Sequence, residues 1–347
     1  MNPLRLPTPR TSLRPRPGMP GPGGPATPTE KDAIVQQTDV DASQSRLSAI
    51  ETGYLKDEFA RLFCENKAGR KFPIINRGTF IRTTALDRVV TTFLSSSPGS
   101  RKQIISFGAG SDTRFFRLCQ TLPSEVLSNL IYHEIDFPAV TTPKVKAILK
   151  HQLLPQESIV AADEEKGSFE SAGYYVHPRD LRTLSPGCEM PKGVETTTPT
   201  LFLSECCLIY LSPEEADGIL KWATGDFKGD VGVVVYEPIG GEDAFGKVMI
   251  QNLAARGIVL KTLKKYSSLE RQKMRFKMLG FTTGQDAADV YFVSEKWISE
   301  EEKERINRLE MLDEVEEWRM LARHYCFAWG WRGDAYEAWR EGWPLQR

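Results

Sequence analysis

The sequence lacks several features that would assign it to a special class of protein. No apolar run among its 347 residues approaches the ~20 residues that span a bilayer. Its 45 lysines and arginines balance 46 acidic residues, and a net charge of -1 argues against general nucleic-acid binding. The six cysteines and four histidines show no paired metal-ligand spacing. We therefore expect a soluble, cytoplasmic protein with reduced thiols, no metal, no membrane contact and no nucleic-acid partner.

The N-terminal segment has almost no residues that could build a core. The stretch "MNPLRLPTPRTSLRPRPGMPGPGGPATPTE" is dense in proline and glycine, carries four arginines and has no acidic residue before Glu30. Such a composition cannot bury enough apolar surface to offset the entropy of ordering. We predict a disordered tail over residues 1–40 and one folded domain over residues 41–347.

The rest of the chain alternates short apolar segments with helical ones. Helical spacing predicts helices over residues 44–63 and 79–94, with a basic loop between them. Five β-branched or apolar segments then read as strands: 103–107, 130–136, 173–177, 200–205 and 231–237. Strands that alternate with helices are typical of a parallel sheet with helices on both faces. The predicted fold is therefore α/β, with helices added at the N-terminus.

Two later segments predict helical additions to this sheet. The segment of residues 256–277 contains eight basic residues and only one acidic residue, Glu270. We predict a helical lid over about residues 240–280. A basic lid would meet an acidic peptide, whereas the alternative is a solvated helix face. The segment "SEEEKERINRLEMLDEVEEWRMLARHY" predicts one long C-terminal helix, with a buried stripe of Ile306, Leu309, Leu312, Val315, Trp318 and Leu321.

A turn with two glycines follows the first predicted strand, in "FGAGSDT". Gly108 and Gly110 allow a tight turn and a close approach to a ligand. A diphosphate-binding fingerprint would place a third glycine near Thr113, where Asp112, Thr113 and Arg114 stand instead. The turn therefore favours a nucleoside ligand without phosphates, although an ordinary turn between strand and helix remains the alternative.

Three acidic residues follow predicted strands. Asp136 ends the second strand, where a carboxylate can accept both ribose hydroxyls, and Asp180 lies beyond the third, where adenine sits in such folds. Glu205 ends an apolar strand, where a buried acid needs a ligand or a counter-charge. For Asp136 and Asp180 the alternative is a helix cap or a surface acid. The capped helix start "SPEE" after "ECCLIYL" places that loop at the ligand-binding edge of the sheet.

Taken together, these motifs resemble those of class I S-adenosylmethionine-dependent methyltransferases with a Rossmann-like sheet. More specifically, the chain is similar to the leucine carboxyl methyltransferases of the type 2A protein phosphatase. The matching words run in the family's order over about residues 42–329: "INRGTFIRT", "FGAGSDTRFFRL", "EIDFP", "RDLR", "LSECCLIYLSPEEADGILKW" and "RHYCFAW".

The resemblance implies S-adenosyl-L-methionine as cofactor and a position for each part of it. The implied donor site consists of Gly108 through its backbone, Asp136 at the ribose, Asp180 and Leu181 at the adenine, Glu205 at the amino group, and Arg82 with Arg46 at the carboxylate. Relatives tend to carry lysine at the position of Arg46; both side chains can pair with a carboxylate, but with different geometry.

The resemblance also implies the acceptor, the α-carboxylate of the C-terminal leucine of the protein phosphatase 2A catalytic subunit. The resulting methyl ester would regulate assembly of the phosphatase holoenzyme. Such a carboxylate, with a pKa of ~3.3 to 3.7, is ionised at pH 7, so no base has to activate it. Arg182 and Tyr210 are our candidates for holding it, because they lie on the two loops that would flank the methyl group. We expect a monomeric enzyme.

Three other functions stay open at this point. A related methyltransferase could act on a small-molecule carboxylate or hydroxyl, and a hydroxyl would need a base, for which His177 is the nearest candidate. A nicotinamide-dependent oxidoreductase shares this type of sheet, but the third glycine and a proton relay are missing. A non-catalytic phosphatase-binding protein would have no use for a complete donor pocket.

Overall fold

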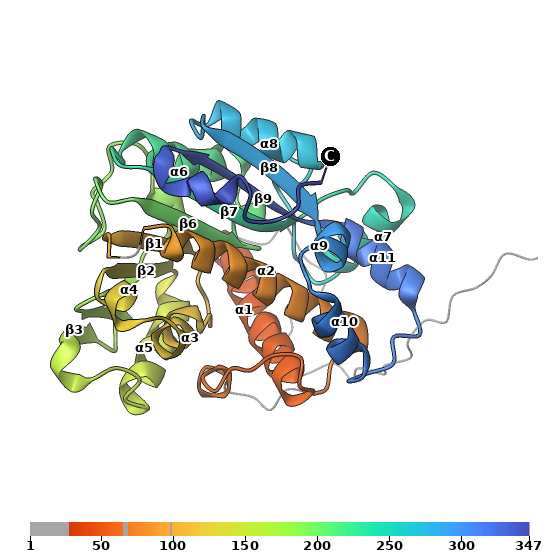
Figure 1. Cartoon of the computed structure of the whole chain (residues 1–347), viewed down its shortest axis with the longest axis horizontal. Coiled ribbons are helices and arrows are strands. Elements are labelled where there is room, and N and C mark those ends of the chain that lie inside the picture. Colours follow the sequence, from red (N-terminus) through yellow and green to blue (C-terminus); the bar gives the residue numbers. More distant parts are fainter. Residues whose placement is uncertain (1–27, 65–68, 98, 347) are drawn as a thin grey trace, which may run out of the picture.

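The computed structural model describes residues 28–64, 69–97 and 99–346, and these residues form a nine-stranded sheet (Figure 1). The strand order is β3-β4-β5-β2-β1-β6-β7-β9-β8. Strands β5, β2, β1, β6 and β7 are parallel, and β3, β4, β9 and β8 pair antiparallel. The strands are β1 (Lys102–Phe107), β2 (Leu130–Asp136), β3 (Ile159–Asp163), β4 (Ser168–Ser171), β5 (Tyr174–Pro178), β6 (Thr200–Glu205), β7 (Val231–Pro238), β8 (Gly284–Asp289) and β9 (Tyr325–Arg332).

Helices cover both faces of this sheet (Figure 1). Successive strand residues point to opposite faces: Ile104 packs in one cluster with residues of α2 and α9, and Ile105 in another with residues of α6 and α8. The helices are α1 (Pro28–Glu51), α2 (Pro73–Ser95), α3 (Arg114–Thr121), α4 (Ser124–Ser128), α5 (Pro138–Lys150), α6 (Pro213–Gly225), α7 (Ala244–Ala254), α8 (Leu269–Met278), α9 (Val290–Lys296), α10 (Glu300–Asn307) and α11 (Val315–Arg323). The 3-10 turns are η1 (Ala60–Leu62), η2 (Gln156–Ser158), η3 (Leu181–Thr183), η4 (Leu208–Tyr210) and η5 (Asp334–Trp339).

The five predicted strands are confirmed as β1, β2, β5, β6 and β7, each within one residue at either end. The capped helix start is confirmed as well, since the Ser212 side chain accepts from the backbone N–H of Glu215 and the Glu215 carboxylate accepts from that of Ser212. The parallel α/β class is therefore correct. The antiparallel strands β3, β4, β8 and β9 were not predicted, and within the described residues no helix is long and apolar enough to cross a membrane.

The predicted boundary of the tail at residue 40 is wrong. Helix α1 begins at Pro28, because Pro28 suits a first helical turn and the polar stretch after it carries apolar residues that face the protein. Ile34 and Val35 of this stretch line the cavity described below. Residues 1–27 of the predicted tail lie outside the described residues. The segment that looked like part of a tail is thus a wall of the molecule's main cavity.

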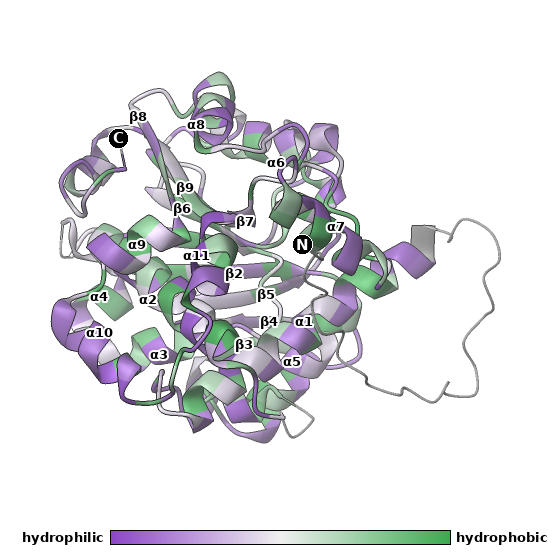
Figure 2. Cartoon of the chain, turned by 90° about the vertical axis from the view of Figure 1, so that its right-hand side faces the viewer, coloured by the Kyte–Doolittle hydropathy of each residue, from purple (hydrophilic) through white to green (hydrophobic). Residues whose placement is uncertain are grey.

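The predicted C-terminal helix is two helices, α10 and α11, separated by residues 308–314 (Figure 1). The chain turns here because Glu310, which is almost fully buried, bonds the amide of Asn76 at 2.9 Å and the guanidinium of Arg70 at 2.7 Å. Figure 2 shows α10 as a largely hydrophilic helix at the periphery. The residues after His324 form strand β9 in place of a helix end.

The predicted lid over residues 240–280 is wrong for its second half. Helix α8 packs on strands β8 and β9, and Phe276 is fully buried there. Arg275, counted among the basic residues of a lid, is buried as well and pairs with acidic residues. Only the segment from Leu253 to Lys261 borders the cavity. The hypothesis of a basic lid therefore applies at most to this short segment.

Two histidines, buried His133 and partly buried His177, stack on neighbouring strands β2 and β5. The ring centres of His133 and His177 are 5.3 Å apart, with Nδ1 of His133 3.0 Å from Nε2 of His177. Burial lowers the pKa of His133 well below its usual range. Burial, with Arg179, lowers the pKa of His177 to about 4. Both rings are therefore neutral at pH 7 and act as packing residues in the sheet.

This stack predicts a pH dependence of stability. Between about pH 6.5 and about pH 4 the unfolded chain binds a proton at His177 that the folded chain does not, so stability falls as pH falls. The effect amounts to roughly 3 kcal/mol, since one pKa unit corresponds to about 1.4 kcal/mol. His177→Phe keeps a ring in the stack and removes the titration. In urea titrations across this window, we expect its free energy of unfolding to fall less steeply than that of the wild type; equal slopes would contradict the assignment.

Candidate functional site

A cavity of about 600 Å³ opens at the carboxyl ends of β1, β2, β5 and β6. Helix α1 forms one wall, and residues of α2 and α11 form another. This is the edge of an open α/β sheet at which ligands bind. All nine residues assigned from the sequence line this one cavity: Arg46, Arg82, Gly108, Asp136, Asp180, Leu181, Arg182, Glu205 and Tyr210.

The turn after β1 depends on both of its glycines. Gly108 and Gly110 have φ values of +61° and +50°, in the left-handed region that side chains rarely adopt. A Cβ atom on Gly108 would lie 2.4 Å from Sγ of Cys207, and one on Gly110 would lie 2.2 Å from Oδ1 of Asp39. Asp39, on α1, also accepts the backbone N–H of Ser111 at 2.8 Å. The turn is therefore tightly enclosed by α1 and by the loop of residues 206–211 that contains η4, called the η4 loop below.

Asp136 lies at the end of β2 beside this turn. Its carboxylate accepts the backbone N–H of Gly110 at 2.8 Å and that of Phe137 at 2.7 Å. Burial raises the pKa of Asp136 to about 6, although these two backbone donors act to lower it. At neutral pH the group is thus an anion with remaining lone pairs toward the cavity, as an acceptor of hydroxyl groups requires.

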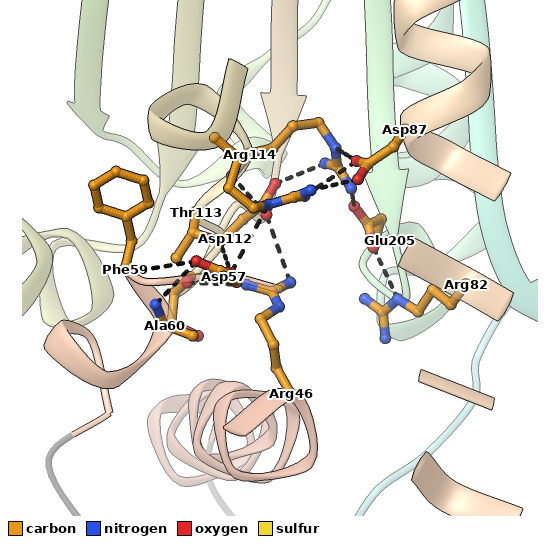
Figure 3. Close-up of polar contacts among 12 residues, drawn as sticks. Arg46, Asp57, Phe59, Ala60, Arg82, Asp87, Asp112, Thr113, Arg114 and Glu205 are labelled. Carbon is orange, nitrogen blue, oxygen red and sulfur yellow. Dashed lines mark hydrogen bonds and ion pairs between the residues drawn. The ribbon is translucent and has the colours of Figure 1, made fainter. Parts of the chain in front are cut away.

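A buried cluster of arginines and acids lies next to the turn (Figure 3). Arg114, only 1% exposed, contacts three carboxylates: Asp112 at 2.7 Å, Glu205 at 2.8 Å and Asp87 at 3.0 Å. Arg82 reaches Glu205 from α2, with Nε 2.8 Å from Oε2. Burial alone would raise the pKa of Glu205, but Arg114 and Arg82 outweigh it and the pKa is lowered. Glu205 is therefore an anion whose orientation is fixed by two cations.

Arg46 extends the cluster from α1 (Figure 3). Its guanidinium donates to the backbone carbonyl of Ser111 at 3.2 Å and lies 3.5 Å from the carboxylate of Asp112. Arg46 and Arg82 thus present two cations to the cavity, and Glu205, which lies between Arg82 and Arg114, presents one anion. This arrangement complements a zwitterionic amino-acid group.

Arg182 differs from its predicted role. Its guanidinium is bound by Asp180, at 2.6 to 3.0 Å, and by Asp32 of α1, at 2.7 and 3.1 Å. A fork held by two carboxylates has little capacity for a third. The assignment of Arg182 to an acceptor carboxylate is therefore corrected: it ties α1 to the loop after β5. Leu181 in the same loop is buried and gives the cavity an apolar wall.

Part of the cavity lining, next to Arg82, is aromatic. Tyr210, Tyr236 and Tyr325 line it together with Trp318 of α11. The rings of Tyr236 and Tyr325 stack at 5.5 Å, and the guanidinium of Arg82 lies 4.9 Å from the centre of the Tyr236 ring. Burial raises the pKa of Tyr210 and of Tyr325. Their hydroxyls are therefore protonated at neutral pH and can donate hydrogen bonds.

Sequence reasoning missed several residues of the site. Asp112 and Arg114 were noted only because they stand where a third glycine would be expected. Two opposite charges in the turn between an apolar strand and a helix could have indicated a buried ion pair, which the structure shows. Asp32 and Asp39 were assigned to the tail. Tyr325 was expected at the end of a helix, and nothing in its local pattern indicates its approach to Tyr236. No histidine lines the cavity in the described part of the chain, and the same residues hold no group of three or more metal-ligating side chains.

Comparison with known proteins shows which protein family this chain matches. Residues 34–224 match the family described as leucine carboxyl methyltransferase. The leucine carboxyl methyltransferase 1 of Aspergillus fumigatus is 48% identical, covering 90% of this chain and 87% of its own length. That of Schizosaccharomyces pombe is 43% identical, covering 84% and 92%. A structure of Haemonchus contortus phosphoethanolamine N-methyltransferase 2 has 13% identity and a TM-score of 0.46, covering 88% and 60%.

The charge cluster predicts a large stability effect at Arg114. Arg114→Met removes the cation that faces three carboxylates, one of them buried and two partly buried, and should lower the free energy of unfolding by about 3 to 5 kcal/mol. Arg101→Met is the matched control, because it breaks an exposed pair with Glu195 and should cost at most about 1 kcal/mol. Urea unfolding measures both. If the two variants lost the same stability, the cluster would not hold the site together.

Proposed function

Because the chain belongs to the leucine carboxyl methyltransferase family, we propose that it methylates the α-carboxylate of a C-terminal leucine, with S-adenosyl-L-methionine as the donor. The proposed acceptor is the catalytic subunit of protein phosphatase 2A. The observation that carries the proposal is the gathering of the seven donor-site residues implied by the family resemblance around one cavity. These residues come from segments far apart in the sequence, so their convergence is a property of the fold.

The residues of the cavity fit the proposed donor. Arg46 and Arg82 suit a carboxylate, and Glu205 suits an ammonium group, so together they match the amino-acid end. Asp136, with two backbone donors and free lone pairs, suits the ribose hydroxyls, and buried Leu181 beside Asp180 suits the adenine. When bound, S-adenosyl-L-methionine supplies an electrophilic methyl group on a sulfonium sulfur.

The reaction requires alignment more than activation. The acceptor carboxylate is ionised at neutral pH and needs no base, so the protein has to hold its oxygen in line with the methyl carbon. Proximity and orientation can supply roughly 7 to 11 kcal/mol in well-organised cases. The frame for this is the β1 turn, which packs against the η4 loop where Gly108 meets Cys207, and the end of β6, where Arg114 joins Glu205 to Asp112 of the turn.

The aromatic side of the cavity suits the acceptor end of the reaction. Tyr210 and Tyr325 keep their protons and can donate hydrogen bonds to a carboxylate without forming a closed ion pair. Trp318, Leu321 and Ala322 of α11 line the same region and offer an apolar surface to a leucine side chain. A hydroxyl acceptor is less well served, because it needs a base and the described cavity lining contains no histidine.

The direct test of this function follows labelled methyl from S-adenosyl-L-methionine onto purified phosphatase catalytic subunit. We expect base-labile label on the intact subunit and none on a subunit that lacks the last leucine. N-acetyl-leucine in a parallel reaction tests the alternative of a small-molecule carboxylate. Donor binding without label on the intact subunit would overturn the proposed acceptor. The cytoplasmic location and monomeric state stay predictions, which cell fractionation and light scattering would test.

Donor affinity should depend on the protonation of Asp136. As pH falls through about 6, Asp136 takes up a proton and loses acceptor capacity, so the Kd for the donor should rise from about pH 7.5 to about pH 5. Asp136→Asn should bind the donor more weakly at about pH 7.5 and show a flatter pH profile in calorimetry. Asp163→Asn, on β3 outside the cavity lining, is the control. A wild-type profile in Asp136→Asn would contradict the ribose assignment.

The pairing of Arg182 with Asp180 and Asp32 gives a further prediction. Arg182→Ala frees Asp180 and releases Asp32 of α1, so the KM for the donor should rise about five- to tenfold. The KM for the protein acceptor should stay within about twofold. Initial rates with each substrate varied in turn separate the two effects. A rise in the acceptor KM alone would restore the assignment of Arg182 to the acceptor carboxylate.

A further inference from the structure

One glycine of the cavity has a backbone conformation that other residues could adopt. Four glycines among the described residues line the cavity: Gly78, Gly108, Gly110 and Gly257. The last three have φ values of +61°, +50° and +76°, a region that favours glycine. Gly78 instead lies inside helix α2 and is not among the residues with positive φ. The backbone conformation therefore gives no reason for a glycine at this position.

The space beside Gly78 gives no steric reason for a glycine either. Beyond its own helix, a Cβ atom on Gly78 would have one described heavy atom within 4 Å, Cζ3 of Trp318 at 3.8 Å, which is an ordinary van der Waals distance. A Cβ atom on Gly257, in contrast, would lie 2.8 Å from Cδ1 of Ile34. Since a glycine inside a helix is less stable than an alanine, the fold alone would favour alanine in place of Gly78.

Gly78 lies one helical turn from the charged residues proposed for the donor. Residues four apart share one face of a helix, so Ile74, Gly78 and Arg82 form a row along α2, and all three line the cavity. Arg82 pairs with Glu205. Trp318 of α11, only 4% exposed, lies beside Gly78. The corner between Gly78 and the Trp318 ring is thus an apolar part of the lining that no described protein atom fills.

We propose that Gly78 determines the specificity for the last side chain of the acceptor, because the corner between Gly78 and the Trp318 ring holds a methyl group of the leucine. A Cβ atom extends about 1.5 Å beyond Cα, so an alanine here would overlap a methyl group that touches Cα of Gly78. The role rests on the proposed function, since it places the acceptor leucine in this cavity.

Shape is the means by which a protein can distinguish aliphatic side chains. Leucine and valine differ only in apolar atoms, so no hydrogen bond separates them, and one methylene in an apolar pocket is worth about 10- to 200-fold in selectivity. A glycine in the wall leaves room for the longer side chain. This gain accounts for a residue that weakens helix α2 and that neither its conformation nor its neighbours require.

A glycine in another helix provides a matched control. Gly218 lies inside α6, is not among the residues with positive φ, and would have no described heavy atom beyond its own helix within 4 Å of an added Cβ atom. It does not line the cavity. Gly78→Ala and Gly218→Ala should therefore raise the thermal midpoint by similar amounts, about 1 to 3 °C, and only the first should change the choice of acceptor.

The test compares phosphatase catalytic subunits that end in leucine and in valine. The wild type should prefer leucine at least about tenfold in kcat/KM. Gly78→Ala should lower this preference at least about fivefold, because its methyl group takes the space of the extra carbon, whereas Gly218→Ala should keep it. The donor Kd should stay within about twofold in both variants. Equal use of both subunits by the wild type, or an unchanged preference in Gly78→Ala, would overturn the proposal.

Calorimetry separates a failure of this proposal from a failure of the proposed function. Each subunit is titrated into the protein saturated with S-adenosylhomocysteine, which has no methyl group to transfer. The wild type should bind the leucine form more tightly, and Gly78→Ala should reduce the difference. Equal affinity for both forms, or no binding of either, would overturn the role of Gly78. A difference that Gly78→Ala reduces, together with no methyl transfer by the wild type, would reject the proposed function and retain the role of Gly78 in binding.

Discussion

The buried guanidinium of Arg114 is the interaction on which the site depends. It touches Asp87 of α2, Asp112 of the β1 turn and Glu205 at the end of β6, so one side chain fixes three elements relative to one another. Burying these carboxylates without a cation would cost several kcal/mol each, by the general penalty for isolated charges in a protein interior. The elements of the cavity therefore keep their spacing before any ligand arrives.

This spacing accounts for how a site without a strong base can catalyse transfer. Glu205 is held by Arg114 from one side and meets Arg82 on the other, which leaves cations and an anion arranged for one zwitterion. In the proposed function, a ligand anchored at that end and at Asp136 has its reactive centre between these two points, in the cavity that Tyr210 also lines. Preorganised charges of this kind act without further rearrangement during the reaction.

The sequence alone predicted the five parallel strands and nine residues of the cavity lining, because both follow from local patterns. Strand β2 ends at Asp136, as predicted, since an apolar run bounded by polar residues marks a buried strand. The helix break at Glu310 could not be predicted, because its cause is a contact with Asn76, 234 positions away. The same holds for Arg182, whose partner Asp32 lies 150 positions earlier in an apparently unstructured tail. Local patterns give elements and candidate residues, whereas long-range pairing decides their roles.

In the proposed function, the arginine cluster recognises an amino-acid zwitterion attached to a nucleoside. Calorimetry with S-adenosylhomocysteine and with 5′-methylthioadenosine, which lacks the amino-acid group, tests this most directly. Loss of the charge-assisted bonds to Arg46, Arg82 and Glu205 should weaken binding of the truncated ligand at least about 100-fold. Equal affinity for the two ligands would mean that the cluster serves only the fold, and would contradict the claim.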